Sequence, residues 1–240
     1  MPQPPRVAII IPALNEEDAI GEVLAHLPLP ASCATVVDNG STDRTATIAV
    51  EAGARVVHEP QRGYGAACLA GLAVNTDADI VVFLDADFSE VPEQMRDLLA
   101  PISSGEADLA LGARVGPGRP WHARLGTWLC VASINLLWGT GYTDLGPFRA
   151  IQRSALDALN MTDRTWGWTI EMQVKAAEAA LRTVEIPVRT RPRIGRSKIS
   201  GSVTGTMRAA ARMIAMIVSL RLTRHERQRW KRGRGGREGE

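Results

Sequence analysis

The segment Ile80-Val81-Val82-Phe83-Leu84-Asp85-Ala86-Asp87 decides the fold class. Its five consecutive apolar residues are typical of a strand buried on both faces, and two aspartates follow directly where that strand ends. In open parallel sheets, ligands bind beyond the carboxyl ends of the strands. Carboxylates there supply the oxygen ligands that Mg²⁺ and Mn²⁺ take, so Asp85 and Asp87 are candidate metal ligands. The alternative is that one of the two aspartates caps the next helix or turn.

Strand and helix signals alternate on both sides of this segment. We expect strands at residues 6–12, 34–38, 54–58, 79–84 and 108–113, and helices at residues 16–27, 42–52, 64–75 and 91–103. Continuous apolar strands separated by helices predict a mostly parallel α/β sheet with helices on both faces.

The alternation weakens after Arg114. We expect a loop at 116–120, an apolar helix over 125–143, a strand-like segment at 144–151, a helix at 168–180, a strand at 183–190, a basic loop at 191–201 and a final helix at 203–222. The length of 240 residues suits one domain, which we place at 1–222, followed by a basic, disordered tail at 223–240.

The positive charge of the chain is concentrated at its C-terminal end. Residues 221–240 hold eight Lys/Arg and three Asp/Glu, although the whole chain has a net charge of only +2. The body is therefore slightly acidic, which argues against a basic nucleic-acid-binding face. RNA binding through residues 232–237 is an alternative, but Trp230 is the only aromatic residue near them in the sequence that could stack on bases.

Two long helices bear on where the protein acts. Residues 125–143 contain no charged residue, and their serine, asparagine and glycines favour a buried or interface-lying helix over a spanning one. The helix at 203–222 either packs on the body or lies on an anionic membrane surface, with the tail as an electrostatic anchor.

The three cysteines lie in apolar stretches and indicate buried, reduced thiols. With no visible signal peptide, we expect a cytoplasmic protein, peripheral at the inner face of the membrane.

Two further polar clusters follow expected strands, at residues 12–16 and 38–43. Asn15 precedes an expected helix, so an N-cap is its ordinary role. Asp38 ends a strand before a glycine turn, and we expect no capping role for it. Its carboxylate could accept a hydrogen bond from a nucleobase N–H or a ribose hydroxyl. Polar groups from three strand ends therefore converge on one edge of the predicted sheet.

These clusters carry a resemblance to the family 2 glycosyltransferases, which have the GT-A fold, a Rossmann-like nucleotide-binding sheet. The segments that carry it are Ile11-Pro12-Ala13-Leu14-Asn15-Glu16, Val37-Asp38-Asn39-Gly40-Ser41-Thr42-Asp43, Arg62-Gly63-Tyr64-Gly65-Ala66-Ala67 and Asp85-Ala86-Asp87. Two later segments resemble the polyprenyl-phosphate branch of that family, the dolichyl-phosphate mannose synthase type: Asp144-Leu145-Gly146-Pro147-Phe148-Arg149 and Arg193-Ile194-Gly195-Arg196-Ser197-Lys198. The similarity extends over about residues 6–220.

The resemblance implies an inverting, metal-dependent transfer of a hexose from a nucleotide-diphosphate sugar, of the GDP-mannose or UDP-glucose type, to a polyprenyl or dolichyl phosphate. It divides the domain into a nucleotide-binding half at about 6–114 and an acceptor half at about 115–222. The residues implied to hold the nucleoside are Pro12, Leu14, Asn15, Glu16 and Asp38. Asp85 and Asp87 would hold the diphosphate and Mg²⁺ or Mn²⁺. The basic residues implied to lie near phosphates are Arg114, Arg149, Arg193, Arg196 and Lys198.

The chain departs from the family pattern at Asn39, Tyr64, Ser89 and Pro147.

The chemical nature of the acceptor decides whether the reaction needs a general base. A lipid phosphate is already anionic and attacks without a general base. A hydroxyl acceptor, on a sugar or small metabolite, needs a carboxylate base, for which Asp144 and Glu171 are the candidates. A sugar nucleotidyltransferase would need a glycine-rich loop after the first strand, and residues 12–17 contain no glycine.

Overall fold

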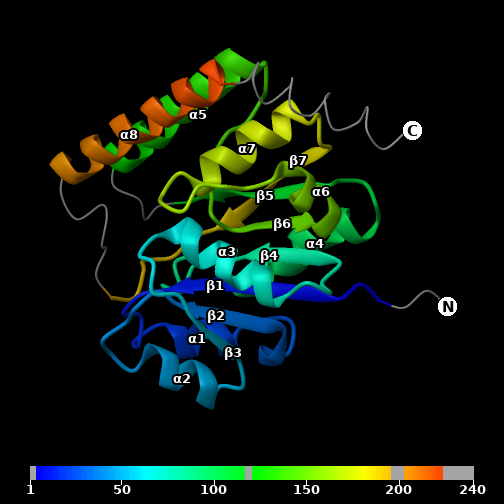
Figure 1. Cartoon of the computed structure of the whole chain (residues 1–240), viewed down its shortest axis with the longest axis vertical. Coiled ribbons are helices and arrows are strands. Elements are labelled where there is room, and N and C mark those ends of the chain that lie inside the picture. The colour runs from blue at the N-terminus through cyan, green and yellow to red at the C-terminus, as the bar shows by residue number, and fades with distance from the viewer. Residues whose placement is uncertain (1–3, 117–120, 196–202, 224–240) are drawn as a thin grey trace, which may run out of the picture.

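The computed structural model describes residues 4–116, 121–195 and 203–223, which form one seven-stranded sheet covered by helices (Figure 1). Its strands are β1 (Val7–Ala13), β2 (Ala34–Asp38), β3 (Arg55–His58), β4 (Ile80–Phe83), β5 (Leu109–Val115), β6 (Arg149–Gln152) and β7 (Thr183–Arg189). They lie in the order β3-β2-β1-β4-β6-β5-β7. The expected mostly parallel α/β sheet is confirmed.

The pairing of the strands creates one edge at which the polar loops meet. Strand β1 pairs in parallel with β2 and β4, β2 with β3, and β5 with β7. Strand β6 runs antiparallel to both β4 and β5. Six strands therefore end at one edge of the sheet, which we call the carboxyl edge, and β6 begins there.

Helices cover both faces of the sheet, as expected. They are α1 (Ile20–Ala25), α2 (Thr45–Glu51), α3 (Tyr64–Val74), α4 (Met95–Ser103), α5 (Trp121–Trp138), α6 (Arg153–Leu159), α7 (Trp168–Glu178) and α8 (Val203–Leu222), with short 3₁₀ turns η1 (Ala31–Cys33) and η2 (Pro92–Gln94). One buried cluster joins α1, α2 and α4 to the sheet, and a second joins α3, α6 and α7 to the opposite face. Helices α5 and α8 lie side by side beyond α7 and share a third apolar cluster with it (Figure 1).

The first helix begins later than the sequence predicts. We expected it from residue 16, whereas α1 begins at Ile20. The backbone N–H groups of residues 15–17 donate instead to side chains that follow β2, namely Ser41 and Asp43 in the loop and Thr45 at the start of α2. These tertiary hydrogen bonds replace the first helical turn and tie the loop after β1 to the loop after β2.

The segment after α5 also differs from expectation. Residues 144–151 were predicted to be strand-like, but only their end forms β6, which is antiparallel to its neighbours. Helix α6 follows directly and was not predicted. A short apolar run gives no information about strand direction, because pairing depends on residues distant in the sequence.

The start of α3 is pressed against a loop a hundred residues away. The backbone N–H of Gly65 donates to the carbonyl of Thr165 at 2.9 Å, and that of Ala66 to the carbonyl of Arg164 at 3.0 Å. A Cβ on Gly65 would lie 2.1 Å from the Asp163 carbonyl oxygen, and one on Gly63 would lie 2.0 Å from that of Arg164. These glycines therefore allow a close approach of the chain to itself.

We expect Gly65→Ala to lower the free energy of unfolding by roughly 1–3 kcal/mol, since backbone must move to admit the methyl group. Gly21→Ala in α1 is the matched control, because its Cβ would make only an ordinary contact, 3.4 Å from Ile48. That control should be neutral or stabilising by up to about 1 kcal/mol, from helix propensity. Urea unfolding measures both changes. Equal stability of the two variants would contradict the close approach at Gly65.

Candidate functional site

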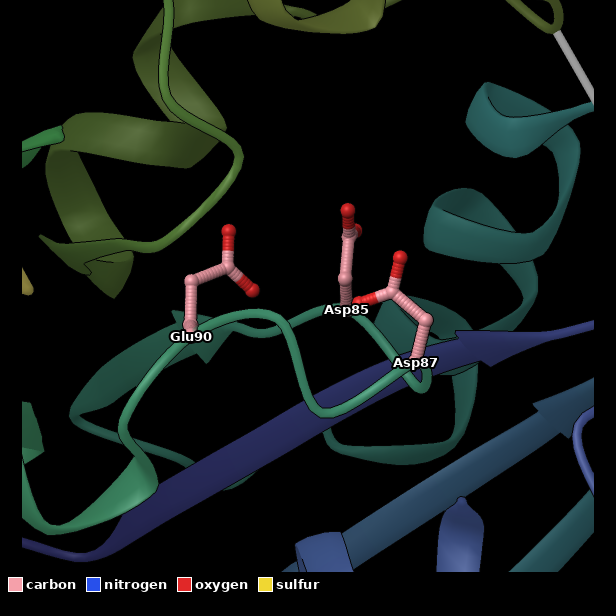
Figure 2. Close-up of side chains that lie close together, drawn as sticks. All are labelled: Asp85, Asp87 and Glu90. Carbon is pink, nitrogen blue, oxygen red and sulfur yellow. The ribbon is translucent and has the colours of Figure 1, made fainter. Parts of the chain in front are cut away.

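Three carboxylates gather on the carboxyl edge just after β4. Asp85, Asp87 and Glu90 each offer an oxygen within 4.8 Å of the others, and Figure 2 shows the three side chains pointing to the same side of one loop. Asp87 is 8% exposed and Glu90 2%, whereas Asp85 is partly accessible. Asp85 and Asp87 are thus brought together as predicted, and Glu90, which the sequence argument missed, joins them.

This carboxylate cluster has an excess of negative charge. Desolvation raises the pKa of Asp85 to about 7, and the charge of Asp87 adds to this effect. Desolvation, followed by the charges of Asp85 and Asp87, also raises the pKa of Glu90 well above its usual value. The buried Oε2 of Glu90 has no hydrogen-bond partner among the described residues. A divalent cation prefers oxygen ligands and would neutralise this charge, so the residues present fit Mg²⁺ or Mn²⁺.

The loop that carries the cluster is folded back at Phe88. This residue has a φ of 58°, a left-handed conformation that is uncommon for a bulky side chain. Its ring packs against His26, with centroids 5.1 Å apart, and under the guanidinium of Arg191 at 4.2 Å. The backbone N–H of Ser89 donates to Oδ1 of Asp87 at 2.9 Å. Packing and hydrogen bonding therefore hold the strained turn that returns Glu90 to the two aspartates.

The segment after β7 lies across this loop. The backbone N–H of Arg191 donates to the carbonyl of Ser89, and that of Ile194 to the carbonyl of Asp87. The Nη2 of Arg193 lies 3.1 Å from Oδ2 of Asp87 and 3.3 Å from Oε1 of Glu16. Arg193, predicted to lie near a phosphate, is thus placed between the loop after β1 and the carboxylate cluster.

The loops after β1 and β2 are joined by hydrogen bonds. The Oδ1 of Asn15 accepts from the backbone N–H of Thr42 at 2.7 Å, and the hydroxyl of Ser41 accepts from the backbone N–H of Asn15 at 2.9 Å. Asn15 therefore bridges two loops and does not cap α1. Pro12 and Leu14 are partly exposed beside it.

Asp38 has a structural contact that the sequence argument did not predict. Its Oδ1 accepts from the backbone N–H of Ser41 at 2.9 Å, and its Oδ2 lies 3.0 Å from Nδ1 of His58. We expected no capping role for Asp38, and it caps no described helix, but it stabilises the turn after β2, because an aspartate before a turn readily accepts a hydrogen bond from the backbone that follows. Burial opposes its ionisation, but the bonds from Ser41 and His58 outweigh that effect and lower its pKa. Asp38 is therefore an ionised acceptor at the carboxyl edge.

Arg114 and Asp144 form a bidentate ion pair. Nε and Nη2 of Arg114 lie 2.6 and 2.9 Å from the two carboxylate oxygens, and the Arg114 backbone N–H donates to Oδ2 as well. Burial lowers the pKa of Arg114, but Asp144 outweighs burial and raises it. This geometry keeps both groups charged.

Arg149 and Glu171 are directed into the protein. Arg149 is fully buried and donates to the carbonyls of Gly146 and Thr169. Glu171 is 2% exposed, so it is not a helix-surface residue. It accepts hydrogen bonds from Thr162 and lies 2.7 Å from Nζ of Lys175.

Two predicted site residues, Arg196 and Lys198, lie outside the described residues, as does the predicted tail from residue 224 onward.

The sequence signal for Glu90 is its spacing from the two aspartates. Asp85, Asp87 and Glu90 form an Asp-x-Asp-x-x-Glu pattern at a strand end. The pattern becomes informative only with the backbone reversal at Phe88, because an extended chain would carry Glu90 away from the aspartates.

Known proteins share this sequence pattern. Residues 8–159 match the profile of Glycosyl transferase family 2. An uncharacterised glycosyltransferase of Mycobacterium tuberculosis is 41% identical over 205 residues, covering 84% of this chain and 93% of that protein. The undecaprenyl-phosphate mannosyltransferase of Micrococcus luteus is 30% identical, covering 83% of this chain and 90% of that protein.

Solved structures share the fold. A crystal structure of glucosyl-3-phosphoglycerate synthase from Mycobacterium tuberculosis, in complex with phosphoglyceric acid, has a TM-score of 0.74 and 26% identity, covering 90% of this chain and 79% of that chain. A second structure of that synthase, with Mn²⁺, UDP-glucose and phosphoglyceric acid, has a TM-score of 0.73 and 23% identity, covering 90% and 80%.

The matched profile spans more than half of the chain, and both protein relatives are at least 30% identical over most of their length. The chain therefore belongs to the family 2 glycosyltransferases and has their GT-A fold.

Proposed function

We propose that this glycosyltransferase moves a hexose from a nucleotide-diphosphate sugar, of the GDP-mannose or UDP-glucose type, to the phosphate of a polyprenyl carrier, with inversion at the anomeric carbon. The Micrococcus luteus relative is an undecaprenyl-phosphate mannosyltransferase, which supports a lipid-phosphate acceptor. One observation in this chain carries the choice of acceptor: both carboxylates predicted to act as a base for a hydroxyl are engaged in ion pairs.

The donor is proposed to lie along the carboxyl edge. Asn15, Glu16 and Asp38 would hold the nucleoside at the joined loops after β1 and β2, and Asp85 and Asp87 would hold the cation beside its diphosphate. A divalent cation there supplies positive charge for the departing nucleotide. Arg193 lies between these two groups, 3.3 Å from Glu16 and 3.1 Å from Asp87, and would orient the diphosphate by its charge.

The choice of a phosphate over a hydroxyl acceptor rests on the ion pairs of the two candidate bases. Asp144 is held by two nitrogens of Arg114, and Glu171 by Lys175 and Thr162. Burial opposes ionisation of Glu171, but Lys175 and Thr162 outweigh it and lower its pKa. A carboxylate with a lowered pKa is a weak general base. A phosphate oxygen needs no base, because it is anionic before it attacks.

The outer surface of α5 supports a lipid acceptor. Trp121, Trp128 and Leu136 are 72%, 62% and 85% exposed and lie on one face of the helix with Leu125. Helix α8, beside it, exposes Val218 and Leu222 just before the basic end of the chain. Among the described residues, no helix combines the length and apolar character needed to cross a bilayer. We propose that α5 and α8 lie on an anionic membrane surface at its cytoplasmic side.

A second candidate is transfer to a hydroxyl of a small phosphorylated acid. It is favoured by the fold's likeness to glucosyl-3-phosphoglycerate synthase in complex with phosphoglyceric acid. In that case the chain needs a general base, which would be either Glu90 or one of the two engaged carboxylates after it leaves its ion pair.

The acceptor is tested by offering labelled GDP-mannose and UDP-glucose with polyprenyl phosphate, the corresponding polyprenol, or 3-phosphoglycerate. We expect label on polyprenyl phosphate alone, dependent on Mg²⁺ or Mn²⁺. Asp87→Asn should lower the rate at least about a hundredfold without unfolding the protein, since a metal ligand is lost. Transfer to 3-phosphoglycerate instead would establish the second candidate, and full activity in excess EDTA would contradict the metal's role.

We expect Asp38→Asn to weaken binding of GDP or UDP about tenfold, because a charged acceptor at the carboxyl edge is replaced by a neutral one of the same shape. Titration calorimetry measures the change. Asp43→Asn is the matched control, since Asp43 also accepts backbone hydrogen bonds in this loop, from Glu17 and Thr45. If both variants lose stability equally and bind the nucleotide as wild type does, Asp38 has only its turn role.

The membrane surface is tested by flotation with vesicles of phosphatidylcholine, with or without phosphatidylglycerol. We expect the protein to float with the anionic vesicles, and less so at high salt. The double change Trp121→Ala and Trp128→Ala should reduce the bound fraction without lowering the melting temperature, because both side chains are exposed. Trp166→Ala, at an exposed tryptophan outside α5, is the control. Equal flotation of all three proteins would argue against this surface.

A further inference from the structure

Glu90 is a buried carboxylate without an evident structural role. It is 2% exposed, its carboxylate accepts a hydrogen bond from the backbone of Asp85, and its Oε2 has no partner among the described residues. Burying a carboxylate that lacks a counter-ion is costly. The charge of Arg114 acts on Glu90, but the guanidinium of Arg114 is bound on two nitrogens by Asp144, so three neighbouring carboxylates still favour a further positive charge at that point.

The geometry directs this carboxylate at the cluster. Its oxygens and those of Asp85 and Asp87 lie within 4.8 Å of one another, and Figure 2 shows the three groups facing the same space. The turn that produces this arrangement contains Phe88 in a left-handed conformation, held between His26 and Arg191. Strain of this kind persists where the surrounding structure enforces it, which is frequent at functional sites.

The nearby cations leave a place for a metal ion. Arg193 is directed to Asp87 and Glu16, and the guanidinium of Arg114 is bound on two nitrogens by Asp144. Neither of these contacts uses Oε2 of Glu90. Cation affinity rises with the number of charged ligands in a site, and three carboxylates hold a divalent ion more tightly than two.

We propose that Glu90 is a third protein ligand of the divalent cation, beside Asp85 and Asp87, and that the protein therefore binds this cation before the nucleotide sugar arrives. The inference rests on the proposed metal-dependent donor chemistry but not on the identity of the acceptor. The alternative role for Glu90 is that of a general base for a hydroxyl acceptor.

The test is Mn²⁺ binding to the full chain without nucleotide, followed by the electron paramagnetic resonance signal of free Mn²⁺. We expect saturable binding by the wild type and at least about tenfold weaker binding by Glu90→Gln, because even outer-shell partners of metal ligands contribute roughly 10–100-fold. Glu93→Gln is the matched control. Glu93 lies three residues on, half exposed and 3.8 Å from Arg191, and its loss should leave the affinity unchanged.

The melting temperature separates a ligand from a structural residue. Without metal, Glu90→Gln should melt no lower than wild type, since an isosteric amide fills the same space and carries no charge, but it should lose the rise in melting temperature caused by Mn²⁺. Glu90→Asp keeps the charge and withdraws the oxygens, so it should also bind Mn²⁺ more weakly. If Glu90→Gln fails to fold, Mn²⁺ binding by Glu90→Asp tests the proposal in its place.

Three results would overturn the proposal. They are wild-type affinity for Mn²⁺ in Glu90→Gln or Glu90→Asp, absence of Mn²⁺ binding by the wild type without nucleotide, and loss of sugar transfer by Glu90→Gln with Mn²⁺ affinity intact. The third result would assign the general-base role. Failure of transfer to polyprenyl phosphate would leave the Mn²⁺ titration unaffected, so the two proposals fail separately.

Discussion

Mutual repulsion among the carboxylates of Asp85, Asp87 and Glu90 is the constraint on which the carboxyl edge of the sheet depends. Desolvation, followed by the charge of the neighbouring carboxylates, raises the pKa values of Asp85 and Glu90, so it is costly to keep all three groups ionised together. The surrounding structure offsets this cost in part, because Arg193 reaches Asp87 from the segment after β7. That segment is held in turn by backbone hydrogen bonds to the loop carrying the cluster. A divalent cation and Arg193, in the segment after β7, would thus both offset the negative charge of this cluster.

Elements with a local signal could be predicted from the sequence, and those that depend on distant contacts could not. The strands of the first half are continuous β-branched runs, so β2 was predicted with its observed bounds and β4 within one residue at each end. The convergence of Asp38 and Asp85 on one edge followed from the same pattern. The antiparallel direction of β6 did not, because it depends on pairing with β4 and β5. Glu90 was missed because its position depends on one backbone angle at Phe88.

The groups proposed to hold the donor and the candidate bases for the acceptor differ in the contacts that they make. Groups proposed to hold the donor lie at strand ends and contact one another through Arg193 and the joined loops. The candidate bases Asp144 and Glu171 lie in the second half and are neutralised by Arg114 and Lys175.

The position of β6 between β4 and β5 has a consequence for biosynthesis. A ribosome that has released residues 1–115 has made β4 and β5, but these strands join one sheet only when residues 149–152 emerge and pair with both. The nascent chain meanwhile carries two apolar strands with unpaired edges, which are templates for aggregation. It also carries the aspartates before Arg193 exists to neutralise them. The sheet can therefore be completed only after β6 and β7, in the second half of the chain, have been made.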